Sequence, residues 1–235
     1  MFRKIIKAVR GKSEKDAFYG FLMQFLGRKT KRKDLYLLAF RHKSASLYEK
    51  GKKLNNERLE YLGDAVLDAI VADVLFRKYP EQKEGFLTKL RSKIVSRKQL
   101  NAIGYALQLD KYLLFKGVMT DNLVGNCVEA LVGAVYLDFG YEKTKKIVEK
   151  QLLERFVDIE VLVRNDENFK SKLVEWVQSR KQTVAFLTEE KEKNGRPYFF
   201  SEVLIDAETQ GRGEGWSKKQ AEQLAAKKTL DKVRK

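Results

Sequence analysis

The spacing of apolar residues divides the chain into two parts, and the first part has a helical period. From about residue 17 to 160, apolar side chains recur three and four positions apart, as in Leu59, Leu62 and Val66, and Pro80 is the only proline. This recurrence is typical of amphipathic and buried helices rather than strands. We therefore expect a mostly α-helical domain over this region.

The second part has a mixed pattern. A helix-like segment at 169–179 precedes stretches rich in β-formers at 183–187 and 199–205, with a turn signal at 193–197 between them. A glycine-spaced stretch then leads into an alanine- and lysine-rich segment at 217–233. The pattern predicts a small α+β domain with the element order α-β-β-β-α.

These patterns predict a division into a basic N-terminal extension at 1–16, a helical domain at 17–160, a polar linker at 161–168 and an α+β domain at 169–235. Within the extension, apolar residues fall at helical spacing between basic ones. Such a helix binds an RNA or membrane surface, or packs on the adjacent domain with its charges solvated. We favour the packed form. No apolar run approaches the roughly 20 residues that span a bilayer, so we expect no membrane insertion.

The composition narrows the chemistry. The chain has 48 Lys and Arg, 32 Asp and Glu and one His, a net charge of +16, which indicates a polyanionic partner. Residues 168–235 hold 15 basic and 10 acidic side chains, so both parts carry a basic excess. With Cys127 as the only cysteine and His42 as the only histidine, an intrachain disulfide and a four-ligand zinc site are both excluded. We therefore expect a reducing, cytoplasmic location and carboxylate chemistry.

Two clusters of polar residues interrupt apolar helical segments. Glu57, Glu60 and Asp64 are spaced i, i+3 and i+7, which places them on one helix face, and Asn126 and Glu129 are similarly spaced i, i+3. Like charges on one face repel, so a divalent cation or paired basic residues must offset them. Spacing alone leaves both explanations open. The candidate basic partners are Arg58, Lys89 and Arg91.

The motifs in these clusters resemble the ribonuclease III family. Residues 56–67 match the signature motif of that family almost letter for letter, and 125–138 resemble its second acidic helix. The stretches 40–44 and 84–88 resemble family landmarks in the expected order. Residues 169–235 resemble a double-stranded RNA-binding domain, the usual C-terminal companion. The resemblance implies an endoribonuclease that hydrolyses phosphodiester bonds in double-stranded RNA, such as rRNA and mRNA precursors.

The resemblance also implies roles for individual acids. Asp64 and Glu129 match the catalytic residues, and the implied ligands of Mg²⁺, or of Mn²⁺ in its place, are Glu60, Asp64, Asn126 and Glu129. Glu57 and Glu84 match accessory acids. A bound Mg²⁺ prefers oxygen ligands and activates a water, so neither a histidine nor a small-molecule cofactor is expected.

Asn126 departs from the family pattern, in which most members carry an aspartate at this position. An amide oxygen can ligate a hard cation, but it lacks the charge of a carboxylate. Two alternatives follow: a natural variant that still cleaves RNA, or a weakened or inactive homologue that only binds double-stranded RNA. We favour the cleaving variant because every other acid of the set is present.

The resemblance assigns RNA contacts to the C-terminal domain, which would recognise the shape of A-form RNA over roughly 16 bp. The matching residues are Lys172, Glu175, Arg196, Ser217, Lys218 and Lys219. Val174 and the turn around Arg196 depart from the family pattern. A DNA-binding protein is a weaker alternative, because the chain lacks a recognition helix.

Three further residues are expected to have roles in assembly or structure rather than in catalysis. The family acts as a homodimer, and Tyr61 stands where it uses an aromatic residue at the dimer contact. His42 matches a landmark outside the carboxylate set, so we expect a structural role rather than a general base. Cys127 is expected to be a buried structural thiol.

Overall fold

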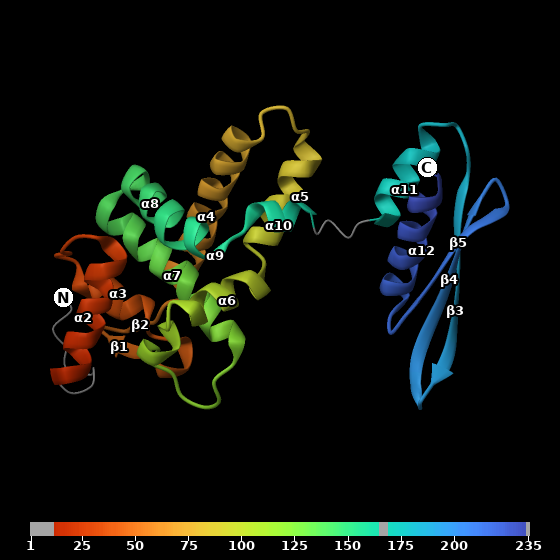
Figure 1. Ribbon diagram of the computed structural model, residues 1–235. Coiled ribbons are helices and arrows are strands. Elements are labelled where there is room, and N and C mark those ends of the chain that lie inside the picture. Colours follow the sequence, from red (N-terminus) through yellow and green to blue (C-terminus); the bar gives the residue numbers. More distant parts are fainter. Residues whose placement is uncertain (1–11, 165–168, 234–235) are drawn as a thin grey trace. The chain divides into compact units, whose positions relative to one another are not determined.

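The chain folds into two compact units, residues 1–162 and 163–235, and the computed structural model describes residues 12–164 and 169–233 (Figure 1). The expected helix at residues 1–10 lies outside these described ranges. In chain order the first unit comprises α2 (Lys12–Leu26), α3 (Lys33–Ala39), the 3-10 turn η1 (Lys43–Ala45), β1 (Leu47–Glu49), β2 (Lys52–Leu54), α4 (Glu57–Lys78), α5 (Glu84–Ile94), α6 (Arg97–Ala106), the 3-10 turn η2 (Leu109–Tyr112), α7 (Asp121–Phe139), α8 (Tyr141–Val148), the π-helical turn η3 (Glu149–Leu153), α9 (Glu154–Phe156) and α10 (Ile159–Arg164).

Helices α4 and α7 form the centre of this unit, and two glycines let them approach closely. A Cβ atom added at Gly63 of α4 would clash with the backbone carbonyl of Glu129 on α7. A Cβ atom at Gly133 of α7 would clash with the carbonyl of Leu59 on α4. The backbones therefore touch where both helices carry their polar clusters. Around this contact the α7 side chains are buried over most of the helix surface, as expected for a central helix.

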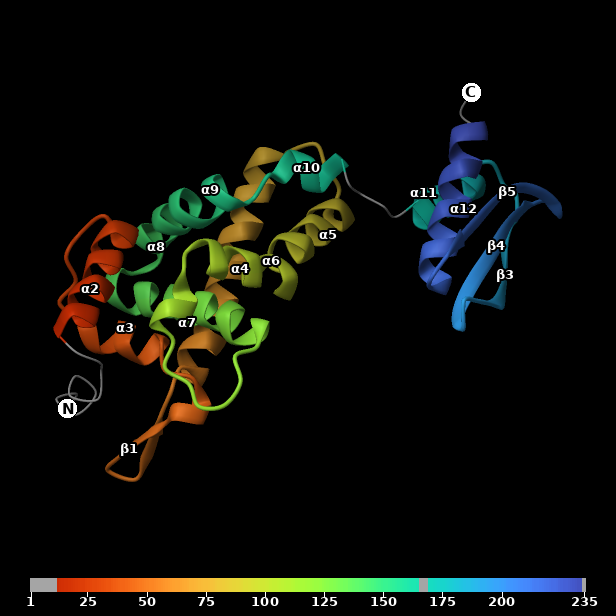
Figure 2. The ribbon, with the colours of Figure 1, turned by 60° about the horizontal axis from the view of Figure 1, so that its bottom comes forward.

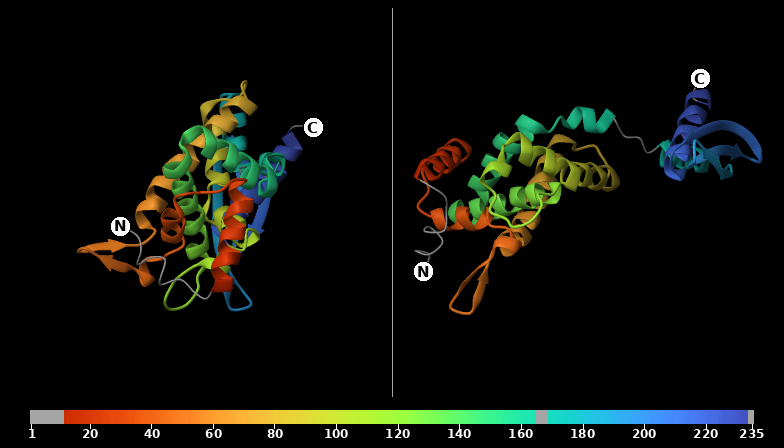
Figure 3. Two further views of the ribbon diagram at one scale, coloured as in Figure 1. Left: turned by 90° about the vertical axis from the view of Figure 1, so that its left-hand side faces the viewer. Right: turned by 90° about the horizontal axis from the view of Figure 1, so that it is seen from below.

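A short antiparallel hairpin projects from the first unit, as Figures 2 and 3 show. Strands β1 and β2 pair Leu47 with Leu54 and Glu49 with Lys52. Lys50 and Gly51 both have positive φ, 50° and 75°, which matches the two-residue turn that favours a tight hairpin. The first unit is mostly α-helical, as expected, and the hairpin is an element that the helical pattern over 17–160 did not predict.

The second unit has the expected α-β-β-β-α order. It comprises α11 (Phe169–Gln178), β3 (Val184–Lys193), β4 (Arg196–Ile205), β5 (Glu208–Gly215) and α12 (Lys218–Val233). The strands form an antiparallel sheet in the order β3-β4-β5, and the two helices cover one face of it (Figure 1). The core between helices and sheet includes Leu173, Val203 and Ala225.

The glycine-spaced stretch of β5 follows from this packing. A Cβ atom at Gly213 would clash with backbone atoms of Ala221 and Ala225 on α12. Only glycine lets the strand and the helix come this close, so the spacing serves the fold.

Two element boundaries differ from the sequence-based ones. Helix α2 begins at Lys12, inside the predicted extension, and α10 extends over Ile159–Arg164, which overlaps the predicted linker at 161–168. The apolar residues of this stretch, such as Val161, suit a short helix better than a polar linker. Within the two described ranges, no helix is both long and apolar enough to cross a membrane.

Candidate acidic active site

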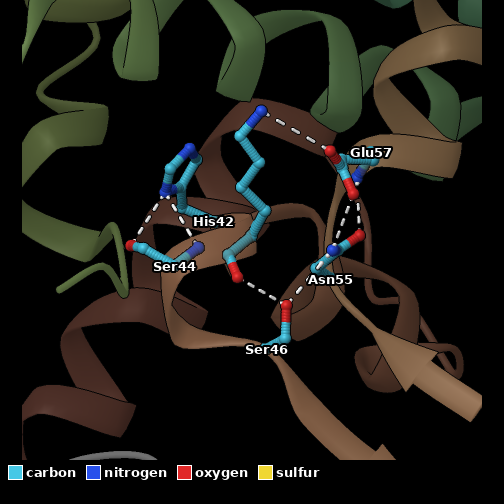
Figure 4. Close-up of polar contacts among 6 residues, drawn as sticks. His42, Ser44, Ser46, Asn55 and Glu57 are labelled. Atoms are coloured by element: carbon cyan, nitrogen blue, oxygen red, sulfur yellow. Dashed lines mark hydrogen bonds and ion pairs between the residues drawn. The ribbon is translucent and has the colours of Figure 1, made fainter.

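The N-terminus of α4 is held in place by a hydrogen-bond network that begins in η1 (Figure 4). The Asn55 amide donates to Oε2 of Glu57 at 2.9 Å and to the Ser46 hydroxyl at 3.2 Å, and its carbonyl oxygen accepts the Glu57 backbone N–H. The Asn55 hydrogen bond lowers the pKa of Glu57, and Lys43, 3.7 Å from Oε1, lowers it further. Glu57 is thus a charged, exposed carboxylate with a fixed position at the edge of the site.

The acids of α4 and α7 meet where the two helices touch. We call Glu60, Asp64 and Asp68 of α4 together with Asn126 and Glu129 of α7 the acid pocket. Partial burial raises the pKa of Glu129 to about 7, and the neighbouring carboxylates of Asp64, Glu60 and Asp68 raise it in the same direction. Burial also raises the pKa of Glu60, while a hydrogen bond with Asn126 opposes this shift. The predicted catalytic and ligand residues are therefore neighbours in the folded chain.

Asp68 and Arg97 also belong to this neighbourhood, and neither was among the predicted site residues. Asp68 lies one helical turn beyond Asp64, and this i+4 spacing is the signal that could have identified it. Arg97, in the first turn of α6, lowers the pKa of both Glu60 and Glu129 through its charge. No motif indicates Arg97, because only the packing of α6 against α7 brings it to the pocket.

The acid pocket fits a hard divalent cation by its chemistry, although it is not a preformed cage. Its polar groups are carboxylate and amide oxygens, which Mg²⁺ prefers. The Oδ1 atom of Asp68 is buried without a hydrogen-bond partner, and burial together with neighbouring carboxylates raises the pKa of Glu129, a shift that Arg97 only partly opposes. Within 12–164 and 169–233, no three His, Cys, Asp or Glu side chains already converge as a metal site.

The remaining predicted residues of the first unit lie outside the acid pocket. Glu84, at the start of α5, accepts a hydrogen bond from Thr88 on its own helix at 2.8 Å, and no interaction among the described residues joins it to the acid pocket. The Nδ1 atom of His42 accepts the Ser44 backbone N–H at 3.2 Å, a structural contact that caps η1. Cys127 is fully buried, and burial raises the pKa of its thiol. The burial of Cys127 agrees with the expected structural thiol, and the cap formed by His42 supports the structural role expected for it.

The predicted RNA contacts of the second unit gather on three segments. Lys172 and Glu175 lie on α11, and Arg196 is exposed at the start of β4, next to the turn at Asn194 and Gly195. At the start of α12, the Ser217 hydroxyl accepts the Gln220 backbone N–H at 3.2 Å. Lys218 and Lys219 are exposed beside this cap, where helix amides and dipole favour phosphate.

Tyr61, the predicted dimer contact, is 82% exposed on α4, on the side of the helix that faces away from the core. Phe76, further along the same helix, is 69% exposed. A groove of about 340 Å³ lies near Phe76, between α4 and α5. These two aromatics are about four helical turns apart, and the exposure of Tyr61 leaves it available to a second chain.

Comparison with known proteins gives the two units separate matches. Residues 32–156 match the family model described as ribonuclease-III-like, and residues 169–233 match the double-stranded RNA binding motif. Ribonuclease 3 of Bacteroides fragilis is 41% identical over an alignment 241 positions long, which covers all of this chain and 83% of that protein. Ribonuclease 3 of Flavobacterium psychrophilum is 38% identical and covers 96% of this chain and 94% of its own length.

A solved structure agrees with the sequence comparisons. The nuclease domain of ribonuclease III from Campylobacter jejuni is 35% identical, with a TM-score of 0.52, over 58% of this chain and 96% of that domain. The segment that matches the ribonuclease-III-like model contains the acid pocket, and the relatives named above match nearly the whole chain. The chain belongs to the ribonuclease III family.

Proposed function

We propose that this protein is an endoribonuclease that hydrolyses phosphodiester bonds in double-stranded RNA. The observation that carries the proposal is the acid pocket, in which burial, together with the neighbouring carboxylates of Asp64 and Glu60, raises the pKa of Glu129 to about 7. Carboxylates gathered at a helix contact destabilise the fold unless a cation offsets their charge. Their presence there therefore points to a functional site. A protein with a net charge of +16 and an anionic pocket suits a polyanionic substrate cleaved with the help of a cation.

The residues of the acid pocket would divide the work between them. Glu60, Asp64, Asn126 and Glu129 would hold Mg²⁺, or Mn²⁺ in its place, through oxygen atoms. When bound, the metal ion supplies a water of lowered pKa and neutralises charge that develops on the phosphate. Asp64 and Glu129 would orient that water and manage its protons, with Glu57 beside them as an accessory acid. Glu84, at the start of α5, would be a second accessory acid.

Asn126 is compatible with activity in this proposal. Its side chain forms a hydrogen bond with Glu60, which opposes the rise of the Glu60 pKa and so favours the charged carboxylate. The amide thus keeps an oxygen in the ligand set while it stabilises a neighbouring anionic ligand. We infer that the substitution lowers the affinity for the metal ion without abolishing cleavage.

The second unit would bind the substrate, and a second copy of the chain would complete the enzyme. Lys172, Glu175, Arg196, Ser217, Lys218 and Lys219 would contact the RNA duplex. Exposed Tyr61 supports a homodimer through α4, and the nuclease domain from Campylobacter jejuni has a structurally flexible region that is involved in dimer formation. We place the reaction in the cytoplasm, on structured RNAs such as rRNA and mRNA precursors.

Incubation of the purified protein with a long RNA duplex tests the proposal. We expect cleavage with millimolar Mg²⁺ or Mn²⁺ and none with EDTA. Asp64→Asn should abolish cleavage while it leaves RNA binding unchanged, because the substitution removes one carboxylate of the acid pocket and nothing from the second unit.

Asn126→Asp separates an enzyme from a pure RNA-binding protein. In an active enzyme, the added carboxylate should lower the Mg²⁺ concentration for half-maximal cleavage by about tenfold, which corresponds to about 1.4 kcal/mol of metal binding. If the natural protein stays inactive with either metal and only Asn126→Asp cleaves, the proposed activity is wrong and the chain is an RNA-binding homologue.

A further inference from the structure

Arg97 is a cation at the rim of the acid pocket, and its position follows from helix packing. On the neighbouring turns of α6, Gly104 packs against Val124 and Val128 of α7, and Asn101 packs against Gly125. The Tyr105 hydroxyl of α6 also donates to Oδ1 of Asp121 on α7 at 2.9 Å, so the helix contacts run antiparallel from Tyr105 and Asp121 to Asn101 and Gly125. The next pair in this direction, one turn on, is Arg97 and Glu129. The charge of Arg97 acts on both Glu60 and Glu129, in agreement with that placement.

The contacts of Arg97 do not explain its presence there. Its side chain is exposed, and among the described residues it forms no ion pair or hydrogen bond. Arg97 lies in the first turn of α6, where the helix dipole disfavours a cation. That turn contains no acid that would offset its charge. Lys43, the other cation near these acids, is by contrast engaged with Glu57 at 3.7 Å. Arg97 therefore keeps all its donors available beside a group of carboxylates.

We infer that Arg97 binds a phosphate of the RNA strand that crosses the acid pocket, and so positions the strand for cleavage. The inference rests on the proposed function, because it takes double-stranded RNA as the substrate. A planar guanidinium donates two parallel hydrogen bonds to phosphate oxygens, a geometry that a lysine cannot supply. The same charge repels a metal ion in the acid pocket, so Arg97 has opposite effects on its two ligands.

Arg97→Gln tests the inference with two binding measurements that need no cleavage. Affinity for an RNA duplex longer than about 16 bp is measured in EDTA over a range of salt concentrations. Loss of one phosphate contact should weaken binding roughly three- to tenfold and reduce the slope of log affinity against log salt by about one. Calorimetry without RNA should show Mg²⁺ binding tighter by about two- to fivefold, since a repelling charge has gone.

Lys98→Gln is the matched control, because Lys98 is exposed on the same helical turn and is not among the main causes of the pKa shifts of Glu60 and Glu129. It should leave the Mg²⁺ affinity unchanged and the RNA salt slope close to that of the natural protein. Arg97→Lys should keep the salt slope but recover only part of the RNA affinity, because it retains the charge without the paired donors.

Two results would overturn the inference: an unchanged salt slope in Arg97→Gln, or equal losses in Arg97→Gln and Lys98→Gln. Either result can occur in a protein that cleaves RNA normally, so the inference can fail alone. If the natural protein binds RNA without cleaving it, the same salt series still decides whether Arg97 contacts phosphate. Failure of the proposed function is therefore distinguishable from failure of this inference.

Discussion

The carboxyl group of Glu129 lies among the carboxylates of Asp64, Glu60 and Asp68, and its pKa is raised to about 7. Between its ordinary value of 4.5 and about 7, the folded protein therefore binds a proton that the unfolded chain releases. This proton stabilises the fold at low pH, and the contribution is lost as the pH rises through 7. Because Glu129 is partly exposed, we expect a contribution on the order of 1 kcal/mol.

Urea unfolding in EDTA from pH 5 to pH 8 measures this contribution. The free energy of unfolding of the natural protein should decline over this range relative to that of Glu129→Gln, a neutral variant of similar shape that carries no titrating group. Saturating Mg²⁺ should stabilise the natural protein most at the alkaline end, where the carboxylate is free of its proton. Parallel pH profiles for the two proteins would contradict the assignment.

At the residue scale, helical spacing and the family motif select the pocket residues apart from Asp68 and Arg97. Asp68 had a sequence signal in its i+4 spacing from Asp64, whereas Arg97 depends on packing. Glu60, Asp64, Asn126 and Glu129 could be selected because helical spacing and the family motif coincide there. Arg97 comes from a third helix with no acidic pattern of its own. The effect of its charge on Glu129 depends on the register between α6 and α7, which no local pattern encodes.

The contact between α4 and α7 is the element-scale feature on which the pocket depends. Gly63 lies between Glu60 and Asp64 and touches the backbone of Glu129. In Gly63→Ala the added methyl must push the helices apart, which should destabilise the fold by about 1–3 kcal/mol. The same shift separates the acids, so cleavage should fall by more than the loss of folded protein explains. Thermal unfolding and the cleavage rate per folded molecule measure the two effects.

Gly20→Ala is the matched control for this substitution. Gly20 lies in the interior of α2 with no atom near the position of an added Cβ, so alanine is free of clashes there. It should stabilise the protein by about 0.5–1 kcal/mol through its higher helix propensity and leave the cleavage rate unchanged. Equal behaviour of the two variants would show that the close helix contact does not matter.

Elements whose apolar pattern extends over many residues were predictable from the sequence, whereas very short elements were not. The helices around the acid clusters and the α-β-β-β-α order follow from apolar patterns that extend over many residues. The hairpin of β1 and β2 has three residues in each strand, and Lys52 and Lys53 belong to the second. Such strands carry almost no hydrophobic pattern, and only the Lys50-Gly51 turn marks them. Their lysines made the segment resemble an exposed part of a helical domain.

The N-terminus of α12 should bind RNA phosphates through charge. Replacing Lys218 and Lys219 together with alanine should weaken duplex binding by about tenfold or more and reduce the salt slope by about two. The control replaces Lys227 and Lys228, which are exposed further along the same helix. Titrations at several salt concentrations compare the two double variants. If both lose the same affinity, the helix contributes only general charge.

At the scale of the whole molecule, the excess of 16 positive charges is distributed over two units with different tasks. The second unit has its charges on surface segments around a complete core, as suits a binding module. The first unit combines a basic excess with an anionic pocket, so a polyanionic substrate attracted by the overall charge meets repulsion at the pocket unless a cation is present. Binding without cleavage should therefore persist in EDTA, supported mainly by the second unit.

The exposed Tyr61 of α4 is the basis of a prediction about the assembly of the whole enzyme. Tyr61→Glu places a charge on a surface that is expected to be apolar and buried between two copies, so association should weaken at least about tenfold. Light scattering should show a dimer for the natural protein and a monomer for the variant at the same concentration. Tyr48→Glu, at a 73% exposed tyrosine on the β1 strand, should remain dimeric.

Because Tyr61 directly follows Glu60, reduced cleavage alone could reflect damage to the acid pocket. Cleavage that recovers when the concentration of the variant is raised would assign the defect to assembly, whereas a natural protein that is monomeric would contradict the homodimer.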